Sequence, residues 1–398
     1  MKHSNFSKIM GVLMVILAVS FIGPEARGQA EATDIVIGQS IPMTSKILNR
    51  DVNVLIALPE EYEASSANYP VFYDLNSFYF TFDRGTIQLL SRMTDIPNMI
   101  LVGVPPLERG YVPTPFEDRQ ESPDAADLSI KFLQEELIPF VEKSYRTNAF
   151  RILYGHSVGG LFTMYTLFNH PDLFTAYIAG SPWFQTNDQY WLKNIEKMAK
   201  ERNLKDKFLF MTVGKDEAEL TLDTYKALEK WMKDTPISGL TWKSVWLEGD
   251  HGSMVGRNIY DGLLFFFRGW KMPFSSLIGA DVETIEKHVK TNTEKWAKFG
   301  FETTTIIPEQ QINSLGYTLL NQKEYDRAVK MFEYNIKRFP ESFNAHDSLA
   351  EAYMIMGDKE KAIKYYKLAV DLNPGDTDYA KRVLKNSKDK LRELGVEY

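Results

Sequence analysis

The feature that most constrains the fold is a short apolar run that enters a glycine-rich turn and then a helical pattern. It reads Arg151-Ile-Leu-Tyr-Gly-His-Ser-Val-Gly-Gly160, and helical spacing continues to Phe168. A strand, a sharp turn and a helix in this order form a nucleophile elbow, which holds its central residue in strained geometry at the end of a sheet. The flanking glycines relieve crowding in the turn. The pattern predicts that Ser157 is a nucleophile that forms an acyl-enzyme.

Strand-like and helical segments alternate from about Ile35 to Phe267. Apolar runs predict strands at 52–59, 69–75, 99–104, 151–154, 174–180, 208–213 and 240–247, and helical spacing predicts helices at 128–145, 158–168 and 220–232. Apolar runs that are bounded by Gly and Pro and separated by helices indicate a largely parallel sheet covered on both faces. We therefore predict a doubly wound α/β domain.

An internal repeat with a period of 34 residues occupies the C-terminal part of the chain. The recurring pairs are Leu315 and Leu349, Lys323 and Gly357, Ala328 and Ala362, Phe332 and Tyr366, and Pro340 and Pro374. This pattern resembles the tetratricopeptide repeat and predicts two repeats followed by a closing helix at 376–394. Two repeats are few for independent stability, so we expect them to pack on the α/β domain or its linker helix. A docking platform for a protein partner is the alternative interpretation.

The N-terminus has the pattern of a secretory signal peptide. Lys2 and Lys8 precede an apolar run at 9–22, and Gly28-Gln-Ala30 supplies small residues for cleavage. An uncleaved anchor is the alternative, but the run is short for a membrane span. We expect a periplasmic or secreted protein without stable membrane insertion after cleavage. The predicted division is a signal peptide at 1–30, an α/β domain at 31–275, a helical linker at 276–310 and a repeat domain at 311–398.

The composition excludes several classes of function. The formal net charge of the 398 residues is −7, which gives no support to nucleic-acid binding. There is no cysteine, so disulfides, thiolate catalysis and thiolate metal sites are excluded. No His-Glu-x-x-His or paired-histidine spacing occurs, which argues against a metal-dependent hydrolase. We therefore expect neither a metal ion nor a cofactor.

A serine hydroxyl needs a base to take its proton, and the chain holds six histidines. His251 lies in a loop after the run 240–247, at the sheet edge where α/β folds place catalytic groups. His156 adjoins Ser157 and cannot fold back on it as a base. The remaining histidines lie in the signal peptide, at a helix end, in the linker helix and in the repeats: His3, His170, His288 and His346. His251 is therefore the predicted base.

A carboxylate should orient this base, and in such a fold it lies between the nucleophile and the histidine along the chain. The run 208–213 leads into Gly214-Lys-Asp-Glu217. Asp216 is the predicted acid, and Glu217 stays open as its rival because a short loop can present either carboxylate. Asp250 is a weaker candidate, since it adjoins His251 and would have difficulty reaching the far ring nitrogen.

The charge that develops on an ester carbonyl needs backbone donors, which form an oxyanion hole. The amide of Val158, the residue after the nucleophile, is one predicted donor. The second is expected in the loop that follows the strand 69–75, between Asn76 and Phe78. The amide of Ser77 or Phe78 is the expected group.

The sequence resembles the putative esterase family of α/β hydrolases, which includes esterase D, feruloyl esterases, mycolyltransferases and siderophore esterases. The segments that carry the resemblance are Tyr69-Pro-Val-Phe-Tyr-Asp-Leu75, Gly159-Gly160-Leu161, Ser181-Pro182-Trp183, Asp250-His251-Gly252 and Tyr260-Asp261-Gly262-Leu263. The resemblance implies an α/β-hydrolase fold with Ser157 as nucleophile, His251 as base and Asp216 or Glu217 as acid. Many relatives have Leu-Asp-Gly where this chain has Leu75-Asn76-Ser77, which leaves the exact oxyanion donor open.

The resemblance also implies substrate-binding residues. Trp183 would lie near the acyl pocket. Arg109 stands where siderophore esterases often carry a basic residue that faces an anionic substrate, and a surface pairing with Glu108 or Glu117 is the alternative. His156, next to the nucleophile, completes the predicted substrate-binding set.

These observations predict a secreted, cofactor-free serine esterase. The substrate candidates are a siderophore trilactone and a carbohydrate-linked acyl ester, between which the sequence does not choose. The alternative is a catalytically weak hydrolase-fold protein that binds a ligand and docks a partner through its repeats. Because no member of the predicted triad is missing, the esterase is favoured.

Overall fold

The computed structural model describes residues 35–63, 65–107, 125–200, 203–235, 237–272, 276, 279–302 and 306–398. The chain divides after Val36, and Ile37–Tyr398 forms one compact unit that contains all the elements below. The predicted signal peptide and Arg109 lie outside the described residues. Among the helices within these ranges, none has the length and apolar character that spanning a membrane requires.

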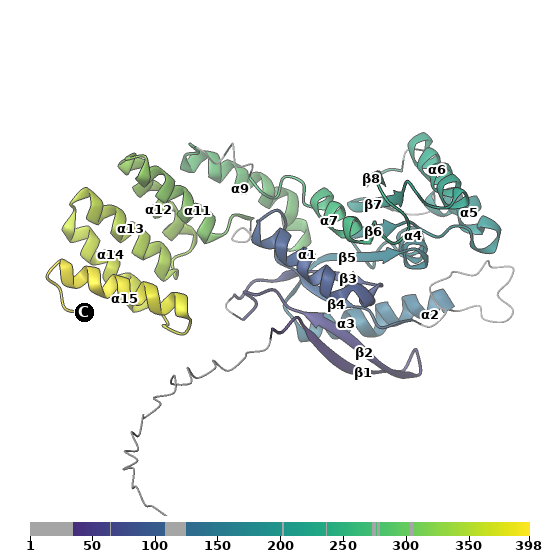
Figure 1. The fold of residues 1–398 in the computed structure, drawn as a ribbon, viewed down its shortest axis with the longest axis horizontal. Helices are drawn as coiled ribbons and strands as arrows, with labels where there is room; N and C mark the ends of the chain where they lie inside the picture. The colour runs from purple at the N-terminus through teal and green to yellow at the C-terminus, as the bar shows by residue number, and fades with distance from the viewer. Residues whose placement is uncertain are drawn as a thin grey trace, which may run out of the picture. The chain divides into compact units, whose positions relative to one another are not determined.

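Eight strands form one sheet in the order β1-β2-β4-β3-β5-β6-β7-β8 (Figure 1). They are β1 (Gln39–Ser45), β2 (Arg50–Ala57), β3 (Tyr69–Asp74), β4 (Ile100–Gly103), β5 (Thr147–His156), β6 (Ala176–Gly180), β7 (Lys207–Gly214) and β8 (Leu240–Leu247). The strands from β3 to β8 pair in parallel, and β2 runs antiparallel to both of its neighbours. The mostly parallel sheet confirms the predicted fold class.

Helices cover both faces of the sheet. Those in the α/β domain are α1 (Phe80–Arg92), α2 (Ala125–Phe132), α3 (Ile138–Ser144), α4 (Val158–Asn169), α5 (Tyr190–Lys200), α6 (Glu219–Asp234) and α7 (Val255–Phe266). The helix predicted at 128–145 is continuous in sequence but contains a π-helical turn, Leu133–Leu137, between α2 and α3. Pro139 lies in the first turn of α3. Because proline lacks an N–H donor, it fits such a break in the hydrogen-bond pattern.

Alternate side chains of the parallel strands enter two separate cores, as their period of two residues requires. Phe72 and Ile152 join the core that includes residues of α1 and α7. Val71 and Leu153, one position away, join the core that includes residues of α2, α3, α4, α5 and α6. The sheet is therefore doubly wound, and the carboxyl ends of its strands remain free to carry a site.

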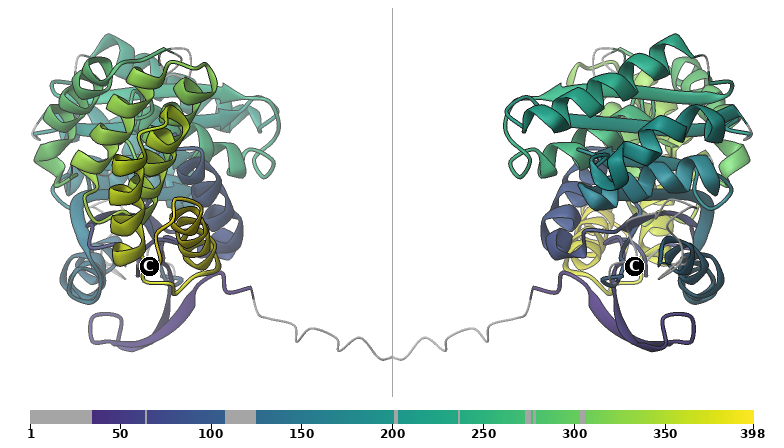
Figure 2. Two further views of the ribbon diagram at one scale, coloured as in Figure 1. Left: turned by 90° about the vertical axis from the view of Figure 1, so that its left-hand side faces the viewer. Right: turned by 90° about the vertical axis from the view of Figure 1, so that its right-hand side faces the viewer.

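The C-terminal helices form antiparallel pairs (Figures 1 and 2). The linker helix α9 (Val282–Trp296) precedes α11 (Glu309–Asn321), α12 (Tyr325–Arg338), α13 (Phe343–Met356), α14 (Lys359–Leu372) and α15 (Asp378–Glu393). They make up two helix pairs and a closing helix, as the repeat pattern predicts. Lys323 and Gly357 turn the chain within the two pairs with φ angles of 61° and 84°. Lysine thus adopts in the first repeat the left-handed backbone that glycine adopts more readily in the second.

The repeats share a core with the linker and the sheet. The ring centroid of Phe150 on β5 lies 5.8 Å from that of Trp296 on α9 and 5.7 Å from that of Phe301. The same core continues through Ile307 to Ile312 on α11. The expectation that the repeats pack on the rest of the chain therefore has a direct structural basis.

Candidate active site

The candidate site gathers residues that follow the carboxyl ends of five adjacent strands. They are Asn76–Phe78 after β3, Ser157 after β5, Ser181 after β6, Glu217 after β7 and His251 after β8. In a parallel sheet these ends meet at one edge, so residues far apart in sequence come close together.

Ser157 occupies the turn between β5 and α4 with φ 59° and ψ −120°. This conformation is strained for a residue with a side chain. Two glycines make the turn compact. A Cβ on Gly155 would lie 2.1 Å from the carbonyl oxygen of Gly159, and one on Gly160 would lie 2.7 Å from that of Gly180. The sequence pattern therefore reflects a real steric requirement at both positions.

Glu217 and His251 form the central hydrogen bond of the site. Nδ1 of His251 lies 2.8 Å from Oε2 of Glu217. The Ser181 hydroxyl lies 2.6 and 2.7 Å from the two carboxylate oxygens and 3.1 Å from the same histidine nitrogen. The Gly214 amide also donates to Oε1 at 3.0 Å. Because Nδ1 is held by the carboxylate, Nε2 is the ring nitrogen available for chemistry.

The charges of these groups follow from their contacts. Burial alone would raise the pKa of Glu217, but hydrogen bonds from His251, Ser181 and the Gly214 amide outweigh it and lower that pKa. The hydrogen bond to Glu217 raises the pKa of His251 against the opposing effect of partial burial. Burial, followed by the neighbouring His251, lowers the pKa of His156 to about 4. At neutral pH the site therefore holds an ionised Glu217 and a neutral His156.

Of the two carboxylates that the sequence left open, Glu217 is the one that reaches His251. Asp216, the first choice from sequence, has an exposed side chain, and its amide donates to the Gly249 carbonyl at 3.0 Å. Asp250 turns back on its own loop, where Oδ1 accepts the Ser253 amide at 2.9 Å. The backbone directs one side chain of the loop inward and its neighbour outward, which separates the two adjacent acids.

The rings of His156 and Trp183 both contact the ring of His251. The ring centroid of His251 lies 4.6 Å from that of His156 and 6.2 Å from that of Trp183. His156 directly precedes Ser157 in the chain, and the Trp183 amide donates to the Ser157 carbonyl at 3.0 Å. The imidazole therefore contacts the residue that precedes Ser157 and a residue whose amide is hydrogen-bonded to Ser157.

The predicted oxyanion donors lie at the starts of two helices. Val158 begins α4, and Ser77 begins a short 3₁₀ turn, Ser77–Tyr79. Amides in the first turn of a helix have no acceptor within that helix. Asn76 joins the two segments, since its Oδ1 accepts the His156 amide at 2.7 Å.

Ser181 has no role among the sequence predictions, and Asn76 enters them only as the first residue of the segment expected to hold the second oxyanion donor. Ser181 is fully buried and has φ 40°, an unusual value for a non-glycine residue. It directly follows the predicted strand 174–180, so its position at the sheet edge could have been noticed. Its contact with Glu217 depends on side-chain direction, which strand spacing alone does not reveal.

A groove of about 530 Å³ lies between α1 and α7. Its lining is mostly apolar and includes Phe82, Leu89 and Tyr260, with Arg257 as a charged member. The lining begins at Thr81, just after the 3₁₀ turn, and includes Ser253, two residues after His251. The groove therefore borders the 3₁₀ turn that follows β3 and the loop after β8 that carries His251.

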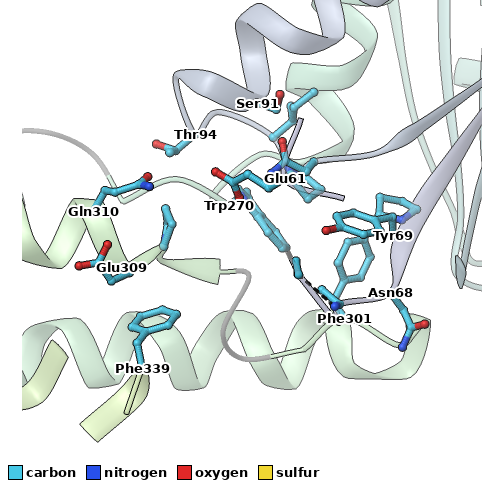
Figure 3. Close-up of a pocket in the computed structure, with 17 residues that line it drawn as sticks. Glu61, Asn68, Tyr69, Ser91, Thr94, Trp270, Phe301, Glu309, Gln310 and Phe339 are labelled. Carbon is cyan, nitrogen blue, oxygen red and sulfur yellow. Dashed lines mark hydrogen bonds between the residues drawn. The ribbon is translucent and has the colours of Figure 1, made fainter. Parts of the chain in front are cut away.

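A second cavity, of about 410 Å³, belongs to another part of the fold. Tyr69 from the amino end of β3, Trp270 and Phe301 surround it, together with Glu309 and Phe339 of the first repeat (Figure 3). None of the residues that line it is a predicted site residue. The amino end of β3 is opposite the strand ends that carry Ser157 and His251.

Comparison with known proteins agrees with this architecture. The family described as "Putative esterase" matches residues 45–239, and a tetratricopeptide repeat matches 343–376. The chain is 31% identical to the ferri-bacillibactin esterase of Bacillus subtilis (strain 168), over 39% of this chain and 61% of that protein. It is 37% identical to the siderophore enterobactin esterase of Emericella nidulans, over 21% of this chain and 30% of that protein. The matches thus span about three fifths or less of these two relatives.

The structure is also similar to that of an IroE-like serine hydrolase from Shewanella oneidensis. The TM-score is 0.61 at 26% identity, and the superposition covers 76% of this chain and 99% of that one. Together with the doubly wound sheet, these similarities assign the α/β domain to the putative esterase family of α/β hydrolases, and tetratricopeptide repeats follow it in the chain.

Proposed function

We propose that the protein is a secreted serine esterase that cleaves carboxylic esters through an acyl-enzyme. The observation that carries the proposal is the Glu217–His251 hydrogen bond at the same sheet edge where Ser157 is held in elbow geometry. Membership of an esterase family supports ester hydrolysis independently of this geometry.

In the first half of the proposed reaction, Nε2 of His251 takes the proton of Ser157 as Oγ attacks the ester carbonyl carbon. Ionised Glu217 stabilises the imidazolium that forms. The amides of Val158 and of Ser77 or Phe78 donate to the oxyanion. The tetrahedral intermediate then collapses, and the alcohol leaves with the proton from His251.

In the second half, a water molecule replaces the alcohol. His251 takes a proton from this water as its oxygen attacks the acyl carbon. Collapse of the second intermediate releases the carboxylic acid and returns the proton to Ser157. No step requires a redox change or an additional reactant.

The groove between α1 and α7 is the proposed binding place for the part of the substrate beyond the ester. Phe82 and Tyr260 are partly exposed there, with 52% and 38% of their surface accessible, and offer aromatic faces. Trp183 would add a third ring near His251. This lining suits a siderophore-type lactone with aromatic arms more directly than an acyl sugar, which would need several polar partners. The names of the curated relatives favour the same choice.

Turnover of p-nitrophenyl esters tests the proposal. The mature protein should hydrolyse short esters, and Ser157→Ala should abolish this while the circular dichroism spectrum and melting temperature remain unchanged. A catecholate trilactone compared with an acetylated or feruloylated sugar identifies the substrate class. If Ser157→Ala retains the wild-type rate, Ser157 is not the nucleophile, whereas a wild-type protein without turnover would support the binding-protein alternative.

Export and the role of the repeats complete the proposal. The N-terminal pattern supports cleavage near residue 30 and a periplasmic or extracellular location, which N-terminal sequencing of the exported protein would test. The core shared by Phe150, Trp296 and Ile312 supports a packing role for the repeats. Docking of a protein partner on their outer surface is compatible with that role.

A further inference from the structure

Two fully buried carboxyl groups lie beneath the candidate oxyanion loop. Asp74 is the last residue of β3, and Asp83 lies in the first turn of α1. Both have 0% exposure, and they lie on the sheet face where Phe80 and Ile87 are packed. A buried charge is costly unless a cation or several hydrogen bonds compensate for it.

No cation compensates here within the described part of the chain. Oδ2 of Asp74 and both carboxyl oxygens of Asp83 are buried without a hydrogen-bond donor from any described residue. The two carboxyl groups lie within hydrogen-bonding reach of each other. Two carboxylates can only accept, so this contact becomes favourable when one proton lies between them. No cluster of three or more ligating side chains that could hold a metal ion occurs among the described residues.

The surroundings raise the pKa of both carboxyl groups. Burial raises the pKa of Asp74 to about 6, a rise that hydrogen bonds from Asp83 and the Asn76 amide limit. Burial and the neighbouring Asp74 charge raise the pKa of Asp83 to about 10. Tyr154 on β5 also faces the pair, and burial raises its pKa well above the ordinary value. At neutral pH the pair therefore holds one proton between its two carboxyl groups, and Tyr154 is neutral.

A chain of hydrogen bonds leads from this pair to the candidate site. Oδ1 of Asp74 accepts the Asn76 amide at 2.7 Å. Oδ1 of Asn76 in turn accepts the His156 amide at 2.7 Å, next to Ser157. Ser77 and Phe78, which carry the expected oxyanion amides, follow Asn76 directly. The carboxylate thus anchors the first residue of the loop, and Asn76 joins the loop to the elbow.

We propose that Asp74 and Asp83 share one proton and that this carboxylic acid–carboxylate pair positions the oxyanion loop. Neither residue touches the substrate, so both are positioning residues. The pair allows a charged acceptor to hold the Asn76 amide inside an apolar core, because the shared proton stabilises that charge. The positioning role rests on the proposed esterase function, whereas the shared proton does not.

Two replacements of similar size separate hydrogen bonding from packing. Asp83→Asn keeps an N–H donor toward Asp74, whereas Asp83→Leu offers none. The leucine variant should lower kcat on p-nitrophenyl esters about tenfold or more with little change in KM, since small displacements of catalytic groups are costly. The asparagine variant should stay within about threefold of the wild type, because its donor replaces the acid proton. Wild-type kcat in the leucine variant, or equal losses in both, would overturn the positioning role.

Ile87→Ala provides the control for ordinary damage to the same core. Ile87 lies on α1, four residues after Asp83, and is 1% exposed. This variant should lower the melting temperature while leaving the kcat of the folded protein near the wild-type value. A loss of kcat as large as that of Asp83→Leu would show that packing, rather than the carboxyl pair, positions the loop.

Infrared spectroscopy tests the shared proton without any turnover. The wild type at neutral pH should show the carbonyl band of a buried protonated carboxylic acid, and Asp83→Asn should lack that band. A wild-type spectrum without the band would refute the proton-sharing pair. Because the spectrum requires no catalysis, this result can be told apart from a failure of the esterase proposal, in which Ser157→Ala would remain active.

Discussion

Replacement of Glu217 with glutamine changes the candidate site in a defined way. The carboxamide has nearly the shape of the carboxylate but carries no charge and has one donor nitrogen. Its oxygen can still accept from Ser181 and from the Gly214 amide, which now contact Oε1 at 2.6 and 3.0 Å. The amide nitrogen then faces Nδ1 of His251, where the carboxylate oxygen now lies at 2.8 Å.

The exchange of an acceptor oxygen for a donor nitrogen opposite Nδ1 changes the tautomer of His251. A donor opposite Nδ1 favours the form whose proton is on Nε2, and that nitrogen can no longer accept the Ser157 proton. The equivalent change in another serine hydrolase lowers kcat by about 10⁴. That factor corresponds to about 5 kcal/mol of lost transition-state stabilisation. We expect a loss of roughly 10³- to 10⁴-fold here, because the remaining contacts keep the side chain in place.

The assay is kcat and KM on a p-nitrophenyl ester, with Asp216→Asn as the matched control. Asp216 is adjacent in sequence but exposed, so its amide variant should stay within about twofold of the wild type. Both variants should melt near the wild-type temperature. The reasoning is refuted if Asp216→Asn loses more activity than Glu217→Gln.

Three further predictions use the same protein. Ser181→Ala removes a hydrogen bond to an ionised carboxylate, worth about 1.5–3 kcal/mol, and should lower kcat at least about tenfold with KM unchanged; an unchanged kcat would contradict this. The base must be neutral, so kcat/KM should fall as pH drops through the pKa of His251, which Glu217 raises above 6.5, and in Glu217→Gln this acid limb should move to lower pH. A limb that stays in place would show that another group titrates. Deletion of residues 311–398 removes Ile312 from the shared core, so differential scanning calorimetry should show a lower melting temperature, while the folded fraction keeps its activity on small esters; an unchanged melting temperature would contradict the shared core.

The sheet and the elbow could be predicted because their signals are local. Buried parallel strands need continuous apolar runs, and the turn at Ser157 needs glycine at positions that only its own backbone crowds. The edge strand β1 was missed, since its residues are largely exposed, it contains Pro42, and no continuous apolar run marks it. The 34-residue repeat was equally readable because each helix pair presents the same small and aromatic residues to its neighbour.

The contacts of the site depend on side-chain direction, which the sequence does not specify. Asp216 and Glu217 are adjacent acids in one loop, and only the folded backbone shows that Glu217 turns inward. The contacts of Ser181 and Asp83 gave no spacing signal, because their partners lie in distant segments, Glu217 in the loop after β7 and Asp74 at the end of β3. Arg109 lies outside the described residues, so its contact with substrate stays a prediction.

Covalent labelling tests the central claim most directly. The protein would be incubated with an ester-mimicking phosphonate that reacts with activated serines, and then analysed by intact mass and peptide mapping. We predict one adduct per chain on the peptide that contains Ser157, lost in Ser157→Ala and strongly slowed in Glu217→Gln. An enzyme that hydrolyses esters at full rate while Ser157 stays unlabelled would contradict the account.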